Sequence, residues 1–138
     1  MTRKEERELA FTIIFEKIFN NDLSVIDIIN NAVEARLIEN NPFAFSVSTI
    51  CYDNIENIDS IISSNAKGWK IERLPKVSLA ILRLALAEII YIDSIPIKVS
   101  INEAVNLAKK FANPEDASFI NGLLGKYVRE NNIQWAYI

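Results

Sequence analysis

The length, composition and charge of the chain already exclude several classes of protein. With 138 residues, 50% of them hydrophobic and 24% charged, the chain is expected to fold as one soluble domain, residues 1–138. Its three glycines and four prolines disfavour a sheet protein with many hairpins. The single cysteine allows no internal disulfide, and no apolar run has the length of a membrane span or a signal peptide. We therefore expect a cytoplasmic protein without membrane contact.

The net charge of −3 hides an uneven distribution of charged residues. Residues 16–66 hold two basic and eight acidic side chains, whereas residues 67–110 hold eight basic and four acidic ones. A weakly acidic protein can therefore present a basic face. Solvated helix faces without any partner explain the same charges equally well.

Apolar residues recur at helical spacing through the first half of the chain. A first helix is expected to end near Asn20. Ser24 is a suitable N-cap for a second helix, whose apolar stripe is expected to extend through the stem of Arg36. After the break at Pro42, one longer helix is expected to run until shortly before Gly68.

The run at residues 77–91 is apolar on most sides, which predicts a central helix packed by several neighbours. A pair of buried strands is the alternative, but the length of the run and its alanines and leucines favour a helix. Residues 69–75, just before this run, are expected to form a short turn or a single helical turn.

Two further helices are predicted after the break at Pro96. Ser100 and Glu103 have the spacing of a capping box at the start of one helix. Asn113 is expected to cap the other, with a proline at its first position. Residues 131–138 are expected to be a loose tail. The sequence therefore predicts an all-α protein of six or seven helices.

The residue types needed for most catalytic centres are missing or isolated. The chain has no histidine, which removes the usual general base and the commonest nitrogen ligand for metals. Cys51 lies on an apolar stripe without a partner base, so a structural thiol is expected. No glycine-rich loop precedes a helix, so no phosphate cradle is expected. We expect no catalytic centre, no metal site and no cofactor, and a site built only of carboxylates stays open.

Basic residues gather at the N-terminus. Arg3 and Arg7 are four residues apart, so they share one face of the first helix, with Lys4 beside them. Guanidinium groups suit phosphate because their planar fork matches its oxygens. Taken alone, the cluster more often means surface pairing with Glu6 and Glu8. Either way, the three cations are expected to be surface charges that contribute little to stability.

The stretch from residue 81 to residue 127 resembles the C-terminal half of the NusB family. Several separate motifs carry the resemblance in order: ILRLA followed by Glu88, Ile95-Pro96 with Val99, INEAV, LAKKF and FINGLL. The N-terminal half is similar to the family through Arg3, Lys4, Arg7, Glu8 and Ala10. The resemblance covers nearly the whole chain up to about Val128.

The resemblance implies an all-α fold of two helical bundles and a function in transcription antitermination. Family members bind boxA-type single-stranded RNA together with a small-subunit ribosomal protein, NusE, and join RNA polymerase indirectly. They take no small-molecule substrate and catalyse no reaction. The residues that the resemblance assigns to RNA are Arg3, Lys4, Arg7, Lys110 and Glu115. Those that it assigns to the region facing the ribosomal protein are Glu72, Arg73, Lys76 and Ser78.

Some residues depart from the family pattern or favour a structural role. Glu5 and Glu6 dilute the N-terminal basic cluster, so weak RNA affinity is expected without the partner. Asn102 and Asn121 are expected to bind backbone groups rather than a ligand, and Glu103 is expected to cap its helix. Two alternatives remain: a helical protein-interaction module without RNA binding, and a NusB-like RNA-binding domain related to ribosomal RNA methyltransferases.

Overall fold

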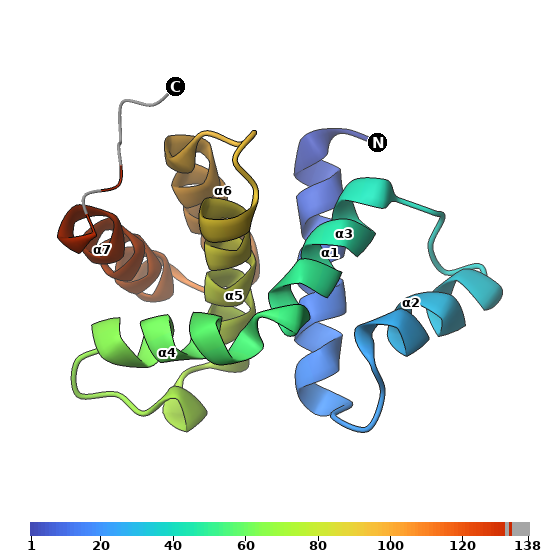
Figure 1. Cartoon of the computed structure of the whole chain (residues 1–138), viewed down its shortest axis with the longest axis horizontal. Coiled ribbons are helices and arrows are strands. Elements are labelled where there is room, and N and C mark those ends of the chain that lie inside the picture. Colours follow the sequence, from blue (N-terminus) through green and yellow to red (C-terminus); the bar gives the residue numbers. More distant parts are fainter. Residues whose placement is uncertain (132, 134–138) are drawn as a thin grey trace.

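The computed structural model describes residues 1–131 and residue 133, and within this part the chain is helical (Figure 1). Seven α-helices, one 3₁₀ turn and no strand are present among these residues. The elements are α1 (Arg3–Phe19), α2 (Val25–Glu34), α3 (Pro42–Asp53), α4 (Ile55–Asn65), η1 (Ile71–Arg73), α5 (Lys76–Tyr91), α6 (Ile97–Phe111) and α7 (Pro114–Glu130). The all-α prediction is confirmed, with the higher of the two expected helix counts.

Several helices begin at a polar side chain that satisfies an unpaired backbone N–H. Thr2 and Ser24 each form a capping box at the start of α1 and α2. Asn41 and Asn113 each accept a hydrogen bond from the backbone N–H three residues ahead, at 2.9 and 2.8 Å. Such a cap contributes about 1 kcal/mol to helix stability. The predicted helix starts at Ser24 and Asn113 are confirmed.

The single long helix expected between Pro42 and Gly68 is wrong, because the structure divides it into α3 and α4 at Asn54. The side-chain amide of Asn54 donates to the carbonyl of Ile50 at 2.8 Å, and its backbone N–H donates to the same carbonyl at 3.2 Å. Residue 54 therefore closes the end of α3. The apolar spacing does not show the break, since both helices bury side chains in the same core.

Arg36 does not continue the apolar stripe of α2, contrary to the prediction. The helix ends at Glu34, and Arg36 is exposed with a left-handed φ of 59°. The N–H of Leu37 donates to the carbonyl of Ala32 at 3.0 Å. A left-handed residue enclosed by such a bond is typical of a helix C-terminus. The prediction failed because it continued the helical spacing to residue 36, whereas the helix ends before that residue.

Helix α6 begins one turn earlier than predicted. Pro96 is its N-cap residue, and the carbonyl of Pro96 accepts a hydrogen bond from the N–H of Ser100 at 3.2 Å. Ser100 and Glu103 therefore lie inside the helix, and the expected capping box is wrong. The proline ring fixes the backbone and brings no N–H that needs a partner, which favours a helix start there.

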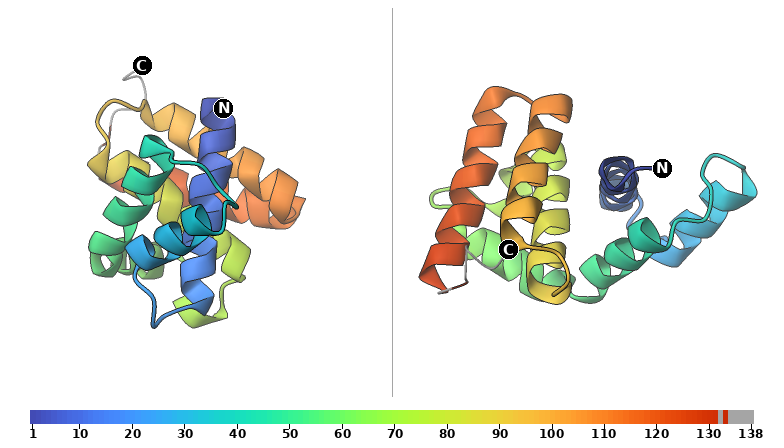
Figure 2. Two further views of the ribbon diagram at one scale, coloured as in Figure 1. Left: turned by 90° about the vertical axis from the view of Figure 1, so that its right-hand side faces the viewer. Right: turned by 90° about the horizontal axis from the view of Figure 1, so that it is seen from above.

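The helices form two groups that meet at α5 (Figures 1 and 2). Helices α1, α2 and α3 pack on one another, and α4, α5, α6 and α7 form the second group. Both α1 and α3 also pack on α5. In the right-hand view of Figure 2, α1 is seen end-on between α5 and α6 on one side and α2 and α3 on the other. The expected arrangement of two bundles around a central helix is confirmed.

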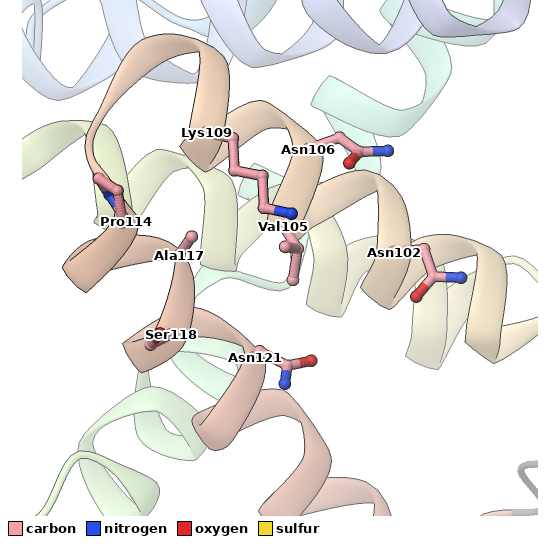
Figure 3. Close-up of a pocket in the computed structure, with 8 residues that line it drawn as sticks. All are labelled: Asn102, Val105, Asn106, Lys109, Pro114, Ala117, Ser118 and Asn121. Atoms are coloured by element: carbon pink, nitrogen blue, oxygen red, sulfur yellow. The ribbon is translucent and has the colours of Figure 1, made fainter.

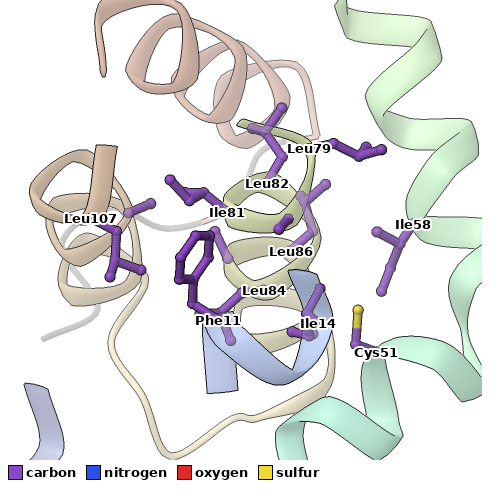
Figure 4. Close-up of a cluster of buried hydrophobic side chains, with 14 of the residues drawn as sticks. Phe11, Ile14, Cys51, Ile58, Leu79, Ile81, Leu82, Leu84, Leu86 and Leu107 are labelled. Carbon is purple, nitrogen blue, oxygen red and sulfur yellow. The ribbon is translucent and has the colours of Figure 1, made fainter. Parts of the chain in front are cut away.

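Side chains of α5 point outward in several directions and meet the other helices (Figure 4). The buried apolar cluster draws on all seven α-helices of the described chain. Its members on α5 include Leu79, Ile81, Leu82, Leu84 and Leu86. Phe11 and Ile14 of α1, Cys51 of α3, Ile58 of α4 and Leu107 of α6 face them. The prediction that residues 77–91 form the central helix is confirmed.

The chain beyond α7 is described only in part. The loose tail expected over 131–138 lies, apart from residues 131 and 133, outside the described residues. Ile133 packs against the core, and its N–H donates to the carbonyl of Val128 at 3.0 Å. Among the described residues, no helix combines the length and the apolar character that crossing a bilayer requires.

Candidate functional site

Arg3 and Lys4 lie on the first turn of α1, which begins at the Thr2 cap. The side chain of Arg3 is 54% exposed, and its Nε lies 3.4 Å from Oε1 of Glu6. The guanidinium carbon of Arg3 lies 3.9 Å from the centre of the Phe43 ring. Lys4 is exposed and forms no ion pair within residues 1–131 and 133. At the N-terminus of α1, Arg3 is therefore positioned by Glu6 and Phe43, whereas Lys4 has no ion-pair partner among the described residues.

Arg7 is a buried residue, which corrects its expected place among the surface charges. The residue is only 5% exposed, and its guanidinium donates to both carboxylate oxygens of Glu88 at 3.0 to 3.1 Å. Ser100 donates to the same carboxylate at 3.0 Å. Glu88 itself is 2% exposed. The ion pair thus joins α1 to α5 inside the protein and occupies Nε and Nη2 of Arg7.

Two features of the sequence could have indicated this pair. Arg7 lies three, four and seven residues before Ala10, Phe11 and Ile14, so it shares the apolar stripe of α1. Glu88 is an acidic residue inside the most apolar run of the chain, where a charge is stable only with a partner. The pairing itself could not be predicted, because 81 residues separate the two.

Lys110 packs beside α1 at the C-terminal end of α6. Its Nζ lies 2.6 Å from Oε1 of Glu8, and its side chain is 55% exposed. The neighbouring Phe111 stacks on Phe11 of α1, with ring centres 5.1 Å apart. Lys110 therefore lies on the same side of the molecule as α1. Glu115 is exposed in the first turn of α7, and no described hydrogen bond or ion pair joins it to the basic residues.

Three of the four residues expected to face the ribosomal protein lie at the surface. Glu72 and Arg73 are exposed in η1, and Nζ of Lys76 lies 3.4 Å from the carbonyl of Glu72. Ser78 is fully buried, and its hydroxyl has no hydrogen-bond partner in the described structure. Its expected place in a contact region is therefore corrected, because Ser78 cannot touch a partner in this conformation.

A polar groove of about 610 Å³ lies between α6 and α7 (Figure 3). Asn102 and Asn121 line it, both exposed, so their expected role in satisfying backbone groups is wrong. Lys109 lies over Val105 between the two helices. Glu103 does not line this groove; it is half-buried on the side facing Arg7. The apolar neighbours of Asn102 and Asn121 along the sequence suggested that both are buried, but both lie on exposed helix faces.

A second internal ion pair was not anticipated by the sequence analysis. The guanidinium of Arg83 donates to both carboxylate oxygens of Asp59, at 2.9 and 2.8 Å, which ties α5 to α4. It also donates to the hydroxyl of Tyr52 at 3.2 Å. Burial raises the pKa of Tyr52 to about 12, so this phenol stays protonated. The sequence again offered one sign of this pair, because Arg83 is a charged residue within the apolar helix α5.

The described residues also define what the cysteine can do. Cys51 has no exposed surface, and burial raises the pKa of its thiol to about 12. A thiol is far less nucleophilic than a thiolate, so the expected structural role of Cys51 is confirmed. Within the described residues, no group of three acidic or cysteine side chains is placed to hold a metal ion.

Comparison with known proteins identifies the relatives of the chain. The model of the NusB family matches residues 4–129. The transcription antitermination protein NusB of Alkaliphilus oremlandii is 42% identical over 134 residues, 96% of this chain and 97% of that protein. The NusB of Natranaerobius thermophilus is 39% identical over 96% of this chain and 98% of that protein.

A solved structure extends the likeness to three dimensions. A crystal structure of the antitermination factors NusB and NusE in complex with double-stranded RNA has a TM-score of 0.80. Its similar chain is 27% identical, and the match covers 94% of this chain and 99% of that one. Sequence and fold agree along almost the entire length, and the chain belongs to the NusB family of transcription antitermination proteins.

Proposed function

We propose that the protein is an antitermination subunit that binds boxA-type single-stranded RNA as a heterodimer with the ribosomal protein NusE. The assembled complex then connects the protein to RNA polymerase indirectly. The observation that carries the proposal is near-full-length similarity to NusB proteins. The likeness to a complex of NusB, NusE and RNA supports the choice of partners. That complex holds double-stranded RNA, and the single-stranded form is the ligand we propose here.

Arg3 and Lys4 are the residues we assign to phosphate. The contacts with Glu6 and Phe43 hold Arg3 in place, and no described hydrogen bond occupies its terminal nitrogens. Those nitrogens can therefore engage two phosphate oxygens at once, as a guanidinium does with planar specificity. Lys4 adds a second, more mobile charge. Arg7 has a positioning role, because its pair with Glu88 fixes α1 against α5.

Lys110 and Glu115 are assigned to the same RNA face. Lys110, whose side chain is 55% exposed, would exchange its partner Glu8 for a phosphate, which costs little because surface ion pairs contribute only about 0–1 kcal/mol. The carboxylate of Glu115 repels phosphate but can accept hydrogen bonds from a base amino group or a ribose hydroxyl. Glu5 and Glu6 lower the local potential, so the protein needs its partner for tight RNA binding.

The partner surface is formed by Glu72, Arg73 and Lys76 at the start of α5. Ser78 contributes only through its position beneath them. We propose a binding role without catalysis, and a cytoplasmic location, where bacterial transcription takes place. The buried thiol of Cys51 is in keeping with this role.

Reversing the charges of Arg3 and Lys4 tests the RNA face. We expect the Arg3→Glu/Lys4→Glu variant to keep its melting temperature, because exposed first-turn charges contribute little to stability. RNA affinity of the heterodimer should fall by about tenfold or more, because phosphate contacts supply much of the binding free energy. The slope of log affinity against log salt should become shallower by roughly 1.4, or about 0.7 for each lost contact. Anisotropy of a labelled boxA strand over a salt series measures both.

A matched control separates local contacts from net charge. The Arg36→Glu/Arg129→Glu variant changes the charge of the protein equally at two other exposed residues. It should retain nearly wild-type affinity and salt slope. The N-terminal cluster is not an RNA contact if the Arg3→Glu/Lys4→Glu variant binds RNA as the wild type does. The same conclusion follows if this variant and the control lose RNA affinity equally. A heterodimer that forms but binds no RNA would favour the interaction-module alternative.

A further inference from the structure

The segment between α4 and α5 displays a tryptophan among basic side chains. Trp69 is 56% exposed. Residues 67–76 hold one acidic residue, Glu72, and four basic ones, Lys67, Lys70, Arg73 and Lys76. None of these charges forms an ion pair within the described chain. Tryptophan and arginine are enriched at protein interfaces, so an exposed indole that is flanked in sequence by cations without ion pairs indicates an interaction surface.

The backbone holds this segment in one shape. Ala66 and Leu74 are 3% and 4% exposed and anchor its two ends in the core. Gly68 turns the chain with a φ of 78°, and the N–H of Trp69 donates to the carbonyl of Ala66 at 3.1 Å. The N–H of Arg73 closes the 3₁₀ turn on the carbonyl of residue 70 at 2.9 Å. The indole is therefore presented on a preformed turn, which reduces the ordering cost of binding.

The segment is remote from the RNA-binding residues that we propose. In Figure 1 and in the left-hand view of Figure 2, the link between α4 and α5 lies at the bottom of the molecule. The N-terminus, which carries Arg3 and Lys4, lies at the top in both views. The two surfaces can therefore be occupied at the same time.

We infer that Trp69 anchors the protein partner, with its indole in an apolar pocket that is rimmed by carboxylates on the partner. The inference rests on the proposed function and names the chemistry of the surface that the partner must bring. Tryptophan and arginine are enriched among residues that dominate binding free energy. The unpaired cations complement acidic groups and speed association with them. An RNA strand fits less well, because Glu72 lies among the cations and Arg3 and Lys4 lie at the other end.

Truncation of the indole tests the anchor. Binding of purified NusE to the full chain is measured by calorimetry for the wild type, Trp69→Ala and Phe19→Ala. Phe19 is a matched control, because it is an aromatic residue that is 60% exposed on α1. We expect Trp69→Ala to weaken the complex by roughly thirtyfold or more, as loss of an interface anchor does. Phe19→Ala should bind within about threefold of the wild type, as residues outside an interface do.

The emission of the indole provides a second readout. The chain has two tryptophans, so in a Trp135→Phe background Trp69 is the only fluorescent indole. NusE in a form without tryptophan should shift the emission of Trp69 to the blue and protect it from iodide quenching. Reversal of Lys67 and Lys70 to glutamate should slow association more than it speeds dissociation.

The outcomes separate this inference from the proposed function. A wild-type chain that does not bind NusE overturns both. A complex that forms equally well with Trp69→Ala, or without a change in Trp69 emission, overturns the anchor alone. If boxA RNA without NusE shifts the emission, and Trp69→Ala weakens RNA binding instead, the segment is a nucleic-acid contact and the anchor is wrong.

Discussion

Replacing Glu88 by glutamine is expected to lower the free energy of unfolding by about 3–5 kcal/mol, the usual effect of breaking a buried ion pair. The substitution keeps the shape of the side chain but leaves the charge of Arg7 without its partner, in a site where both residues are at most 5% exposed. It also weakens the hydrogen bond from Ser100. Urea denaturation followed by circular dichroism measures the change.

The exposed pair of Glu8 and Lys110 is the natural control for Glu88. It joins a carboxylate to a lysine ammonium group at 2.6 Å, and the lysine side chain is 55% exposed. Glu8→Gln should therefore change stability by less than about 1 kcal/mol. An Arg7→Met/Glu88→Leu double variant should regain most of the stability lost in Glu88→Gln, since it leaves no buried charge. A loss below about 1 kcal/mol for Glu88→Gln would contradict the buried-pair interpretation.

Placing a carboxylate at Leu84 is expected to unfold the protein or leave it insoluble. Leu84 is 1% exposed in α5, the helix that both groups of helices contact. An unpaired charge there costs several kcal/mol, a large part of the roughly 5–15 kcal/mol that stabilises a domain. Soluble expression and a thermal melt of Leu84→Asp provide the measurement.

Two further variants keep this test informative. Leu84→Ala should stay folded but lose about 2–5 kcal/mol through lost burial and the cavity left behind. Ile26→Asp introduces the same charge at a residue that is 59% exposed on α2, and it should fold normally. A soluble Leu84→Asp protein with an unchanged melting temperature would show that α5 is not the central helix.

Helical spacing predicted most of the fold, because each helix must bury one apolar stripe and α5 must bury several. It did not predict the break at Asn54, since α3 and α4 bury side chains in one core and their spacing continues across the break. The start of α6 was misplaced because Ser100 and Glu103 match a capping box, whereas Pro96 determines where the helix begins. A local motif therefore identifies only a possible helix end, and another residue one turn away, here Pro96, can be the actual one.

The surface was harder to predict than the core. Arg3 and Lys4 are exposed as expected. The spacing places Arg7 on the apolar stripe of α1, but it does not show which distant residue pairs with it there. Burial of that residue depends on α5, which lies far along the chain. The same limit applies to Ser78, whose position matched a contact region while its side chain points into the core.

The central claim, that the protein recognises boxA RNA jointly with NusE, is tested most directly by one titration. Labelled boxA RNA is titrated with the protein, with NusE and with their equimolar mixture, and a scrambled strand is titrated in parallel. We expect the mixture to bind boxA at least about tenfold more tightly than either protein alone, within the usual range for coupled binding. It should also prefer boxA over the scrambled strand. A mixture that binds boxA no better than its separate components, or no better than it binds the scrambled strand, would contradict the account.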